Sequence, residues 1–132
     1  MSDDLLEVTD KPIIPEEVIS RVKGYNCGAI ITFIGRVRPY SRDRRVISLE
    51  HEIPENGEET LLKVIASELR EKWILGEIAF CYRTGPVLPE EPTVVIVVSS
   101  VRRQEAFAAC QYAIDRFKQI ATAREILEDG ED

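Results

Sequence analysis

Two cationic side chains, Arg103 and Lys118, lie where the surrounding sequence repeats apolar residues. Residues 99–103 read Ser-Ser-Val-Arg-Arg and directly follow an aliphatic run at 94–98. If residues 102–121 form a helix, the 100° step places both cations on the stripe that holds Phe107, Cys110, Ile114, Phe117 and Ala121. A charge on such a stripe is costly unless it is paired or lies at an opening. One such cation would extend past the apolar face to solvent, but two favour an anion site.

A second group of cations lies in the segment 36–45. It holds Arg36, Arg38, Arg42, Arg44 and Arg45 against the single acid Asp43. The whole chain carries a net charge of −7, which argues against a general nucleic-acid binder. A basic loop in an acidic chain indicates a small anionic ligand or an acidic partner tail. The last three arginines fit a solvated hairpin loop equally well, whereas Arg36 and Arg38 continue a predicted strand and can be held rigidly.

The composition favours a single globular domain over residues 1–132. Hydrophobic residues make up 44% of the 132 residues, enough for a real core. The longest aliphatic run, residues 94–98, is far too short to span a bilayer, and the acidic start is not that of a signal peptide. Three cysteines without paired spacing and one histidine, His51, argue against zinc. We therefore expect a cytoplasmic protein with reduced thiols, no membrane association and no metal site.

The hydrophobic periodicity predicts an α+β fold with helices packed on a mixed, mostly antiparallel sheet. Helices are expected from residue 14 to a stop at Gly24, at 58–73 and at 102–121, and strands at 28–37, 46–53, 77–83 and 93–99. The strand 46–53 is the expected antiparallel partner of 28–37, across the arginine loop. Ser100 is the expected N-cap of the last helix. The acidic tail, residues 125–132, is expected to be flexible.

An ordered set of short motifs covers roughly residues 12–120. It comprises the strand 28–38, Leu49-Glu50-His51-Glu52, Trp73-x-Leu75-Gly76, Arg83-x-Gly85, the segment from Ser99 to Phe107, and Ile114-Asp115-x-x-Lys118. In this order and spacing the motifs resemble the large, catalytic subunit of molybdopterin synthase. The resemblance implies an α/β hammerhead fold and a homodimer of large subunits. It also implies one small ubiquitin-like subunit at each end, which makes a heterotetramer.

The resemblance further implies a reaction. Cyclic pyranopterin monophosphate becomes the dithiolene molybdopterin, with sulfur supplied as a thiocarboxylate on the small subunit, a sulfur carrier ending in Gly-Gly. Lys118 matches the catalytic lysine of the family, Arg38 its strand arginine and Arg103 its helix-start arginine. Phe33 and Ile114 match positions that line the pocket for the partner's tail. The sulfur transfer itself needs no metal and no other cofactor.

The charges of the reactants agree with the reading from the residues. The pterin phosphate and the sulfur donor are both anions, and arginine offers bidentate geometry to phosphate. We expect Arg36, Arg38, Arg102, Arg103 and Arg124 to bind them. A lysine on an apolar stripe is partly desolvated, which favours a lowered pKa and a role in proton transfer or nucleophilic attack.

The chain departs from the family pattern at several positions. Arg102 replaces a histidine at the helix start, and Tyr82 replaces another before Arg83. A second functional lysine is absent: an ungapped alignment places Glu125 there, and a two-residue deletion places Ala123 there, followed by Arg124. The chain also stops before the residues that, in the family, cross to the neighbouring subunit.

These departures leave three hypotheses about function. The first is an active synthase subunit in which Arg124 stands in for the lost lysine. The second is a catalytically weak paralogue that serves as a binding module for a ubiquitin-like sulfur carrier. A third, an RNA-binding domain using the loop 36–45, lacks an aromatic platform apart from Tyr40.

The spacing of Arg103 and Lys118 adds one expectation about assembly. Fifteen residues of helix correspond to roughly 22 Å along the axis, too far for one compact ligand to bridge. If both cations serve one anion, one of them must come from a neighbouring copy of the chain, and the site is shared across a two-fold dimer.

Overall fold

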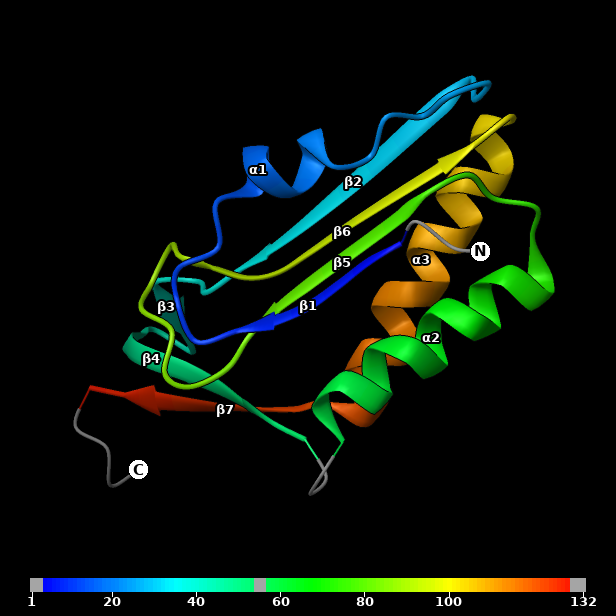
Figure 1. The fold of residues 1–132 in the computed structure, drawn as a ribbon. Helices are drawn as coiled ribbons and strands as arrows, with labels where there is room; N and C mark the ends of the chain where they lie inside the picture. The colour runs from blue at the N-terminus through cyan, green and yellow to red at the C-terminus, as the bar shows by residue number, and fades with distance from the viewer. Residues whose placement is uncertain (1–3, 54–56, 129–132) are drawn as a thin grey trace.

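The computed structural model describes residues 4–53 and 57–128, and its centre is a four-stranded sheet (Figure 1). The strand order is β1 (Leu5–Thr9), β5 (Ile78–Arg83), β6 (Pro92–Ser100) and β2 (Ala29–Arg36). The pair β1–β5 is parallel, and the pairs β5–β6 and β6–β2 are antiparallel. The mostly antiparallel α+β fold predicted from the sequence is therefore confirmed.

Helices cover both faces of this sheet. α2 (Glu58–Lys72) and α3 (Arg103–Ile120) pack on one face over the main core, and the short α1 (Pro15–Ser20) packs on the other (Figure 1). The middle strand β6 is buried on both faces, which explains its uninterrupted aliphatic sequence. Within the described residues, none of the helices has the length and apolarity needed to cross a membrane.

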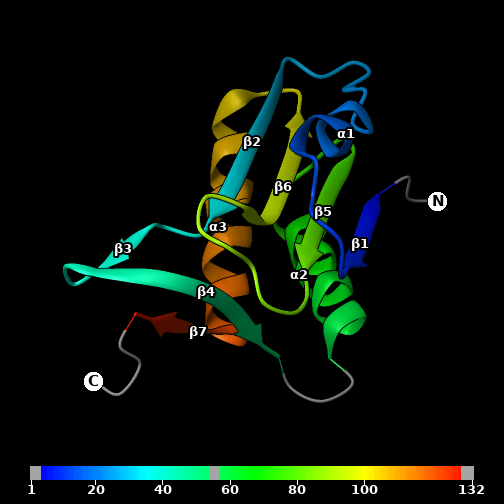
Figure 2. The ribbon, with the colours of Figure 1, turned by 90° about the vertical axis from the view of Figure 1, so that its left-hand side faces the viewer.

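A smaller sheet lies at the end of α3. It consists of β3 (Tyr40–Ser41), β4 (Arg44–Glu52) and β7 (Thr122–Leu127), with β7 antiparallel to β4 (Figure 2). Residues 125–127, expected to begin a flexible tail, thus belong to a strand. Residues 129–132 of that tail lie outside the described part of the chain.

The predicted pairing of the strands 28–37 and 46–53 is wrong. β2 pairs with β6 over its whole length, and β4 pairs with β3 and β7. Arg42 and Asp43 both have positive φ, 53° and 65°, and form the tight turn that places Ser41 opposite Arg44. This turn folds β4 back on β3 and leaves the central β6 as the partner of β2.

The buried face of α3 differs from the stripe drawn on the sequence. Its fully buried residues include Ala106, Ala109 and Ala113, whereas Phe107 is 57% exposed. The alanines face the sheet, and small side chains let the helix approach it closely. Ile114 and Lys118 therefore lie at the border of the buried face. The helix begins at Arg103 without a side-chain cap, because Ser100 ends β6 and is buried.

Candidate active site

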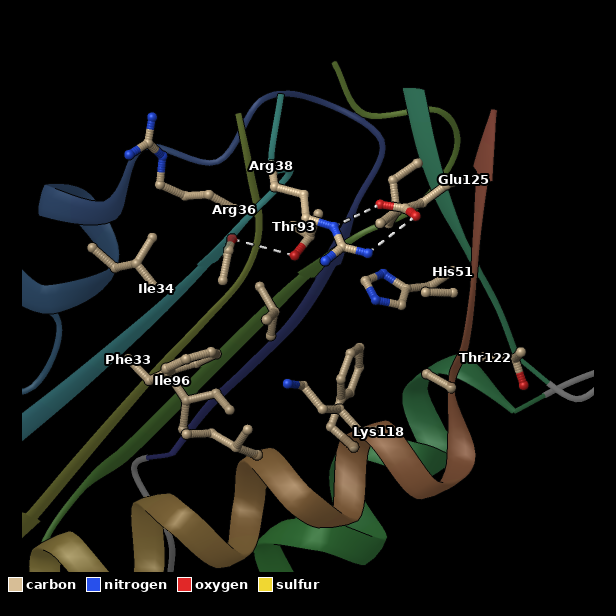
Figure 3. A pocket seen from close by; sticks show the side chains of 17 residues that line it. Phe33, Ile34, Arg36, Arg38, His51, Thr93, Ile96, Lys118, Thr122 and Glu125 are labelled. Atoms are coloured by element: carbon tan, nitrogen blue, oxygen red, sulfur yellow. Dashed lines mark hydrogen bonds and ion pairs between the residues drawn. The ribbon is translucent and has the colours of Figure 1, made fainter. Parts of the chain in front are cut away.

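A pocket of about 770 Å³ lies between the two sheets and the last turns of α3 (Figure 3). β2 and β6 supply one wall, β4 and β7 another, and α3 the floor. The apolar lining consists mainly of Phe33, Leu49, Val94, Ile96, Ile114 and Phe117. The polar lining consists of Arg36, Arg38, His51, Thr93, Lys118, Thr122 and Glu125. The pocket is thus an apolar cavity with several charged groups at its wall.

Lys118 projects its amine into this pocket from the last turn of α3 (Figure 3). Ile114 precedes it by one helical turn on the same side of α3, and Phe33 faces both from β2. The structure therefore brings together the three residues that the sequence analysis assigned to the reacting group and the tail pocket. Lys118 itself remains solvent-exposed in the single chain.

Arg38 lines the same pocket and is already paired with an acid. Its Nε donates to Oε2 of Glu125 at 3.1 Å, and its Nη2 donates to Oγ of Ser41, also at 3.1 Å. The hydrogen bond from Arg38 holds the pKa of the Glu125 carboxyl below its usual value, and the carboxylate raises the pKa of Arg38. The pair keeps both charges present at the pocket wall near neutral pH.

The other predicted arginines are not gathered around Lys118. Arg36 lines the pocket, but its Nε donates to the carbonyl of Glu90 at 3.0 Å. Arg124 is exposed and does not line the pocket, whereas its neighbours Ala123 and Glu125 do. Arg102 and Arg103 are exposed at the opposite end of α3. Within one chain, only Arg36 and Arg38 of the five expected arginines reach the site.

His51 is a pocket residue that the sequence reasoning did not assign to the site. Its ring meets those of Tyr82 and Phe117 edge to face, at centroid distances of 5.7 Å and 5.2 Å. Burial, with a contribution from the charge of Lys118, lowers the pKa of His51 below its ordinary value of 6.5. A signal for this residue exists in the sequence, because His51 follows the apolar Leu49 by two positions in a predicted strand and so shares its face.

Tyr82, one of the family departures, is a core residue beneath His51. Its hydroxyl donates to the His51 carbonyl at 3.4 Å, and burial raises the pKa of Tyr82 to about 12.

The three cysteines are free thiols, and burial raises the pKa of Cys81 to about 12 and of Cys110 to about 11. The thiols of Cys81 and Cys110 stay protonated near neutral pH, so they are poor nucleophiles. No three His, Cys, Asp or Glu side chains of the described residues form a metal-binding group.

The arrangement suits the chemistry of an anionic reactant. An apolar cavity strengthens the attraction of fixed cations for an anion. The amine of Lys118, once deprotonated, can accept a proton or attack a carbonyl carbon. The fold and site define a small α+β protein whose apolar pocket contains an arginine–carboxylate pair and a primary amine.

Comparisons with known proteins place this chain in a family. The model of the MoaE protein family matches residues 8–120, and the chain belongs to that family. A protein of Bacillus subtilis named molybdopterin synthase catalytic subunit is 42% identical over 127 residues, covering 95% of this chain and 81% of that protein.

Solved structures agree with this assignment. Molybdopterin synthase from Staphylococcus aureus superposes with a TM-score of 0.84 at 32% identity, covering 98% of this chain and 95% of the other. A chain from a complex of subunits 1 and 2 of molybdopterin-converting factor from Helicobacter pylori has a TM-score of 0.73 at 16% identity, covering 93% and 85%. The second match shows the shared fold alone.

Proposed function

We propose that this chain is the catalytic subunit of a molybdopterin synthase and acts as a sulfurtransferase. It moves sulfur from a thiocarboxylated small subunit to cyclic pyranopterin monophosphate. The observation that carries the proposal is the position of Lys118, whose amine enters an apolar pocket beside the Arg38–Glu125 pair. The names of relatives over 30% identical across most of the chain support it.

The shape of the pocket supports a partner with a thin tail that lacks side chains. Phe33 and Ile114 form apolar walls, and Lys118 stands between them as a cation. A tail that ends in Gly-Gly has no side chains to clash with those walls, and its terminal anion would meet the amine. The Helicobacter pylori protein of the same fold was solved in a complex of subunits 1 and 2 of molybdopterin-converting factor, which is consistent with a second kind of chain as partner.

We also propose that two copies of the chain share each site. Arg103 begins α3 and Lys118 lies in its last turn, which leaves roughly 22 Å between them at 1.5 Å per residue. A phosphate-bearing pterin bound near Lys118 cannot also reach Arg103 of the same chain. The exposed position of Arg102 and Arg103 leaves them available to a neighbouring copy.

The edge of the main sheet supplies a surface for that neighbour. β2 ends the four-stranded sheet on one side, and its face presents Ile30 and Ile34 to solvent. A long apolar edge strand without a protecting charge near its middle is typical of a strand that pairs with another chain. Antiparallel pairing of β2 with its own copy around Thr32 places Ile30 opposite Ile34 of the second copy.

The same pairing completes the site. β2 and α3 run in the same direction, because Ala29 pairs with Ser100 near the start of α3, while Gly35 and Arg36 line the pocket near its end. A two-fold axis through the middle of β2 therefore brings the start of one α3 toward the end of the other. Arg103 of each copy then approaches Lys118 of the second copy.

Reconstitution tests the proposed function directly. The purified chain is mixed with a thiocarboxylated small subunit and cyclic pyranopterin monophosphate, and dithiolene product is measured. We expect product to form with sulfur from the small subunit. Absence of product, when a known synthase works under the same conditions, would refute the enzymatic function.

One observation favours the binding-module alternative. Glu125 occupies a pocket position and neutralises Arg38, whereas Arg124, the candidate replacement for the lost family lysine, does not line the pocket. Under this alternative the chain binds the small subunit but produces little dithiolene. Calorimetry with the small subunit, run beside the reconstitution, separates the two readings.

A further inference from the structure

The imidazole of His51 has hydrogen-bonding capacity that the protein does not use. Its Nδ1 is buried and has no hydrogen-bond partner. The ring is directed from β4 into the pocket, between the Arg38–Glu125 pair and Lys118 (Figure 3). Edge-to-face contacts with Tyr82 and Phe117 fix the ring in this orientation. A buried polar ring without a partner is costly, and such groups concentrate where a ligand binds.

The other polar groups of the pocket differ from His51 in this respect. Arg38 is paired with Glu125, Arg36 donates to the Glu90 carbonyl, and Thr93 donates to the Gly35 carbonyl. Thr122 turns its hydroxyl away from His51 and Lys118 (Figure 3), so among the polar side chains that line the described walls of the pocket these two face its interior without such a bond.

The enclosure of Nδ1 also assigns the proton of the neutral ring. A proton on Nδ1 would leave a buried N–H without an acceptor, which is rarer in proteins than an unused acceptor. The proton is therefore better placed on Nε2, the nitrogen through which the ring can meet a ligand. His51 then offers one N–H donor to the cavity.

We propose that His51 is a catalytic residue whose Nε2–H donates a hydrogen bond to the terminal carbonyl or thiocarbonyl group of the partner's tail. This role rests on the proposed function, because it requires the tail to enter the pocket. Once the tail's sulfur has bonded to a pterin carbon, the tail is held as a thioester, and when water attacks its carbonyl carbon a C–O bond forms and negative charge develops on the carbonyl oxygen. The bond between that carbon and the sulfur then breaks, which leaves the sulfur on the pterin and the tail as a carboxylate. A fixed donor in an apolar site stabilises this charge more than it stabilises the resting carbonyl.

Two substitutions separate the hydrogen bond from the packing. His51→Phe keeps an aromatic ring against Tyr82 and Phe117 but removes the donor. His51→Gln restores an amide N–H near the position of Nε2. We expect His51→Phe to lower kcat at least about tenfold with a smaller change in KM, and His51→Gln to recover part of that loss. Tyr112→Phe, which removes a hydroxyl on the far side of α3 that donates to Glu68, is the matched control and should leave kcat unchanged.

Nuclear magnetic resonance gives a readout that needs no turnover. His51 is the only histidine of the chain, so ¹⁵N-histidine labelling yields the signals of one ring. A synthetic peptide with the small subunit's terminal Gly-Gly sequence should shift the Nε2 resonance, and the pterin alone should not. If the reconstituted wild type is inactive, the proposed function fails, and this titration still decides whether His51 contacts the tail.

Three results would overturn the role of His51. One is an unchanged kcat in folded His51→Phe. Another is a His51→Gln variant as slow as His51→Phe, which would indicate packing alone. The third is an Nε2 resonance that does not respond to the peptide or responds only to the pterin. If His51→Phe does not fold, the Gln variant and the titration carry the test.

Discussion

At the scale of single residues, the pocket combines a cation, an ion pair and a neutral histidine in one apolar space. Lys118 contributes a primary amine to the pocket, while Arg38 is held by Glu125. His51 stays uncharged near neutral pH, since burial and Lys118 both lower its pKa. In the proposed function, the charged groups attract the anion, and neutral His51 donates a hydrogen bond without competing with Lys118.

The lowered pKa of His51 predicts a dependence of stability on pH. Because the folded chain binds a proton at His51 less readily than the unfolded chain, whose histidine titrates near 6.5, protonation favours unfolding. Above pH 6.5, His51 is neutral in both states and the free energy of unfolding has its full value. We expect the free energy of unfolding to fall as the pH drops below 6.5. Urea unfolding of the wild type and His51→Phe between pH 7.5 and 5.5 measures the effect.

The comparison of the two proteins isolates this residue from the carboxylates, whose titration begins at lower pH. His51→Phe should show a smaller decline in stability over the same interval. Equal declines in both proteins would contradict the assignment of a depressed pKa to His51.

At the scale of elements, β7 decides which residues face the pocket. Ala123 pairs with His51 across the small sheet, and both line the cavity, as does Glu125. Strand alternation turns Arg124 to the other face. The two alignments place Ala123 or Glu125 at the position of the missing family lysine. Both residues line the pocket, whereas Arg124 does not.

This geometry predicts that a lysine adds a cation to the pocket at Ala123 but not at the neighbouring Arg124. Ala123→Lys should strengthen binding of inorganic phosphate about tenfold, because a charge-assisted hydrogen bond contributes roughly 1.5–3 kcal/mol. Arg124→Lys, the matched substitution on the neighbouring residue, should leave phosphate binding unchanged. Isothermal calorimetry compares the two, and a similar gain in both would show that the face assignment of β7 is incorrect.

The close packing of α3 on the sheet gives a second prediction for an element. Ala113 is fully buried against the main sheet, so Ala113→Leu should overpack the interface and destabilise the chain by about 1–3 kcal/mol. Ala108→Leu, on the exposed face of the same helix, should change stability by less than about 0.5 kcal/mol. Urea midpoints measure both. A tolerant Ala113→Leu would mean that α3 lies farther from the sheet than described.

The helices and strands differ in how well their positions could be predicted from the sequence. The helices α2 and α3 and the strand β6 were predictable within a few residues, since each carries a long apolar pattern of one period. β7 was not, because Thr122–Leu127 lacks an alternating apolar pattern and gains its place by pairing with β4. The pairing of β2 was misassigned because the alternation of its side chains fits any partner equally well.

The residues of the site likewise divide into those that were predictable from the sequence and those that were not. Lys118, Phe33 and Ile114 were predictable from their motifs and meet in one pocket. His51 and Glu125 were missed: alternation with Leu49 indicates which face of the strand His51 occupies, but only the contact between the small sheet and α3 makes that face part of the pocket. The buried face of α3 was predicted around Phe107, but the helix buries alanines instead. A periodicity drawn from large apolar residues does not detect such a face.

At the scale of the whole molecule, the proposed account requires a dimer. Ile30→Glu places a charge at the exposed edge of β2 and should dissociate the dimer without unfolding the chain. Analytical ultracentrifugation distinguishes the two states, and Val64→Glu, which alters an exposed apolar residue on α2, is the control. A dimer that survives Ile30→Glu would place the interface elsewhere.

Mixed dimers test the shared site independently of which surface forms it. Arg103→Ala and Lys118→Ala chains are each expected to be inactive alone. When they exchange subunits, half of the sites in a mixed dimer combine an intact Arg103 with an intact Lys118, and activity should return. Free exchange without any recovery would contradict a site built from two chains.

The most direct test of the central claim is the turnover of Lys118→Ala with a thiocarboxylated small subunit and cyclic pyranopterin monophosphate. The side chain is exposed, so the variant should fold and assemble like the wild type. Lys63→Ala, which removes an equally exposed lysine from α2, is the matched control. The account predicts that Lys118→Ala forms no measurable dithiolene product while Lys63→Ala retains full activity. Near-normal product formation by Lys118→Ala would contradict the assignment of this pocket as the site of sulfur transfer.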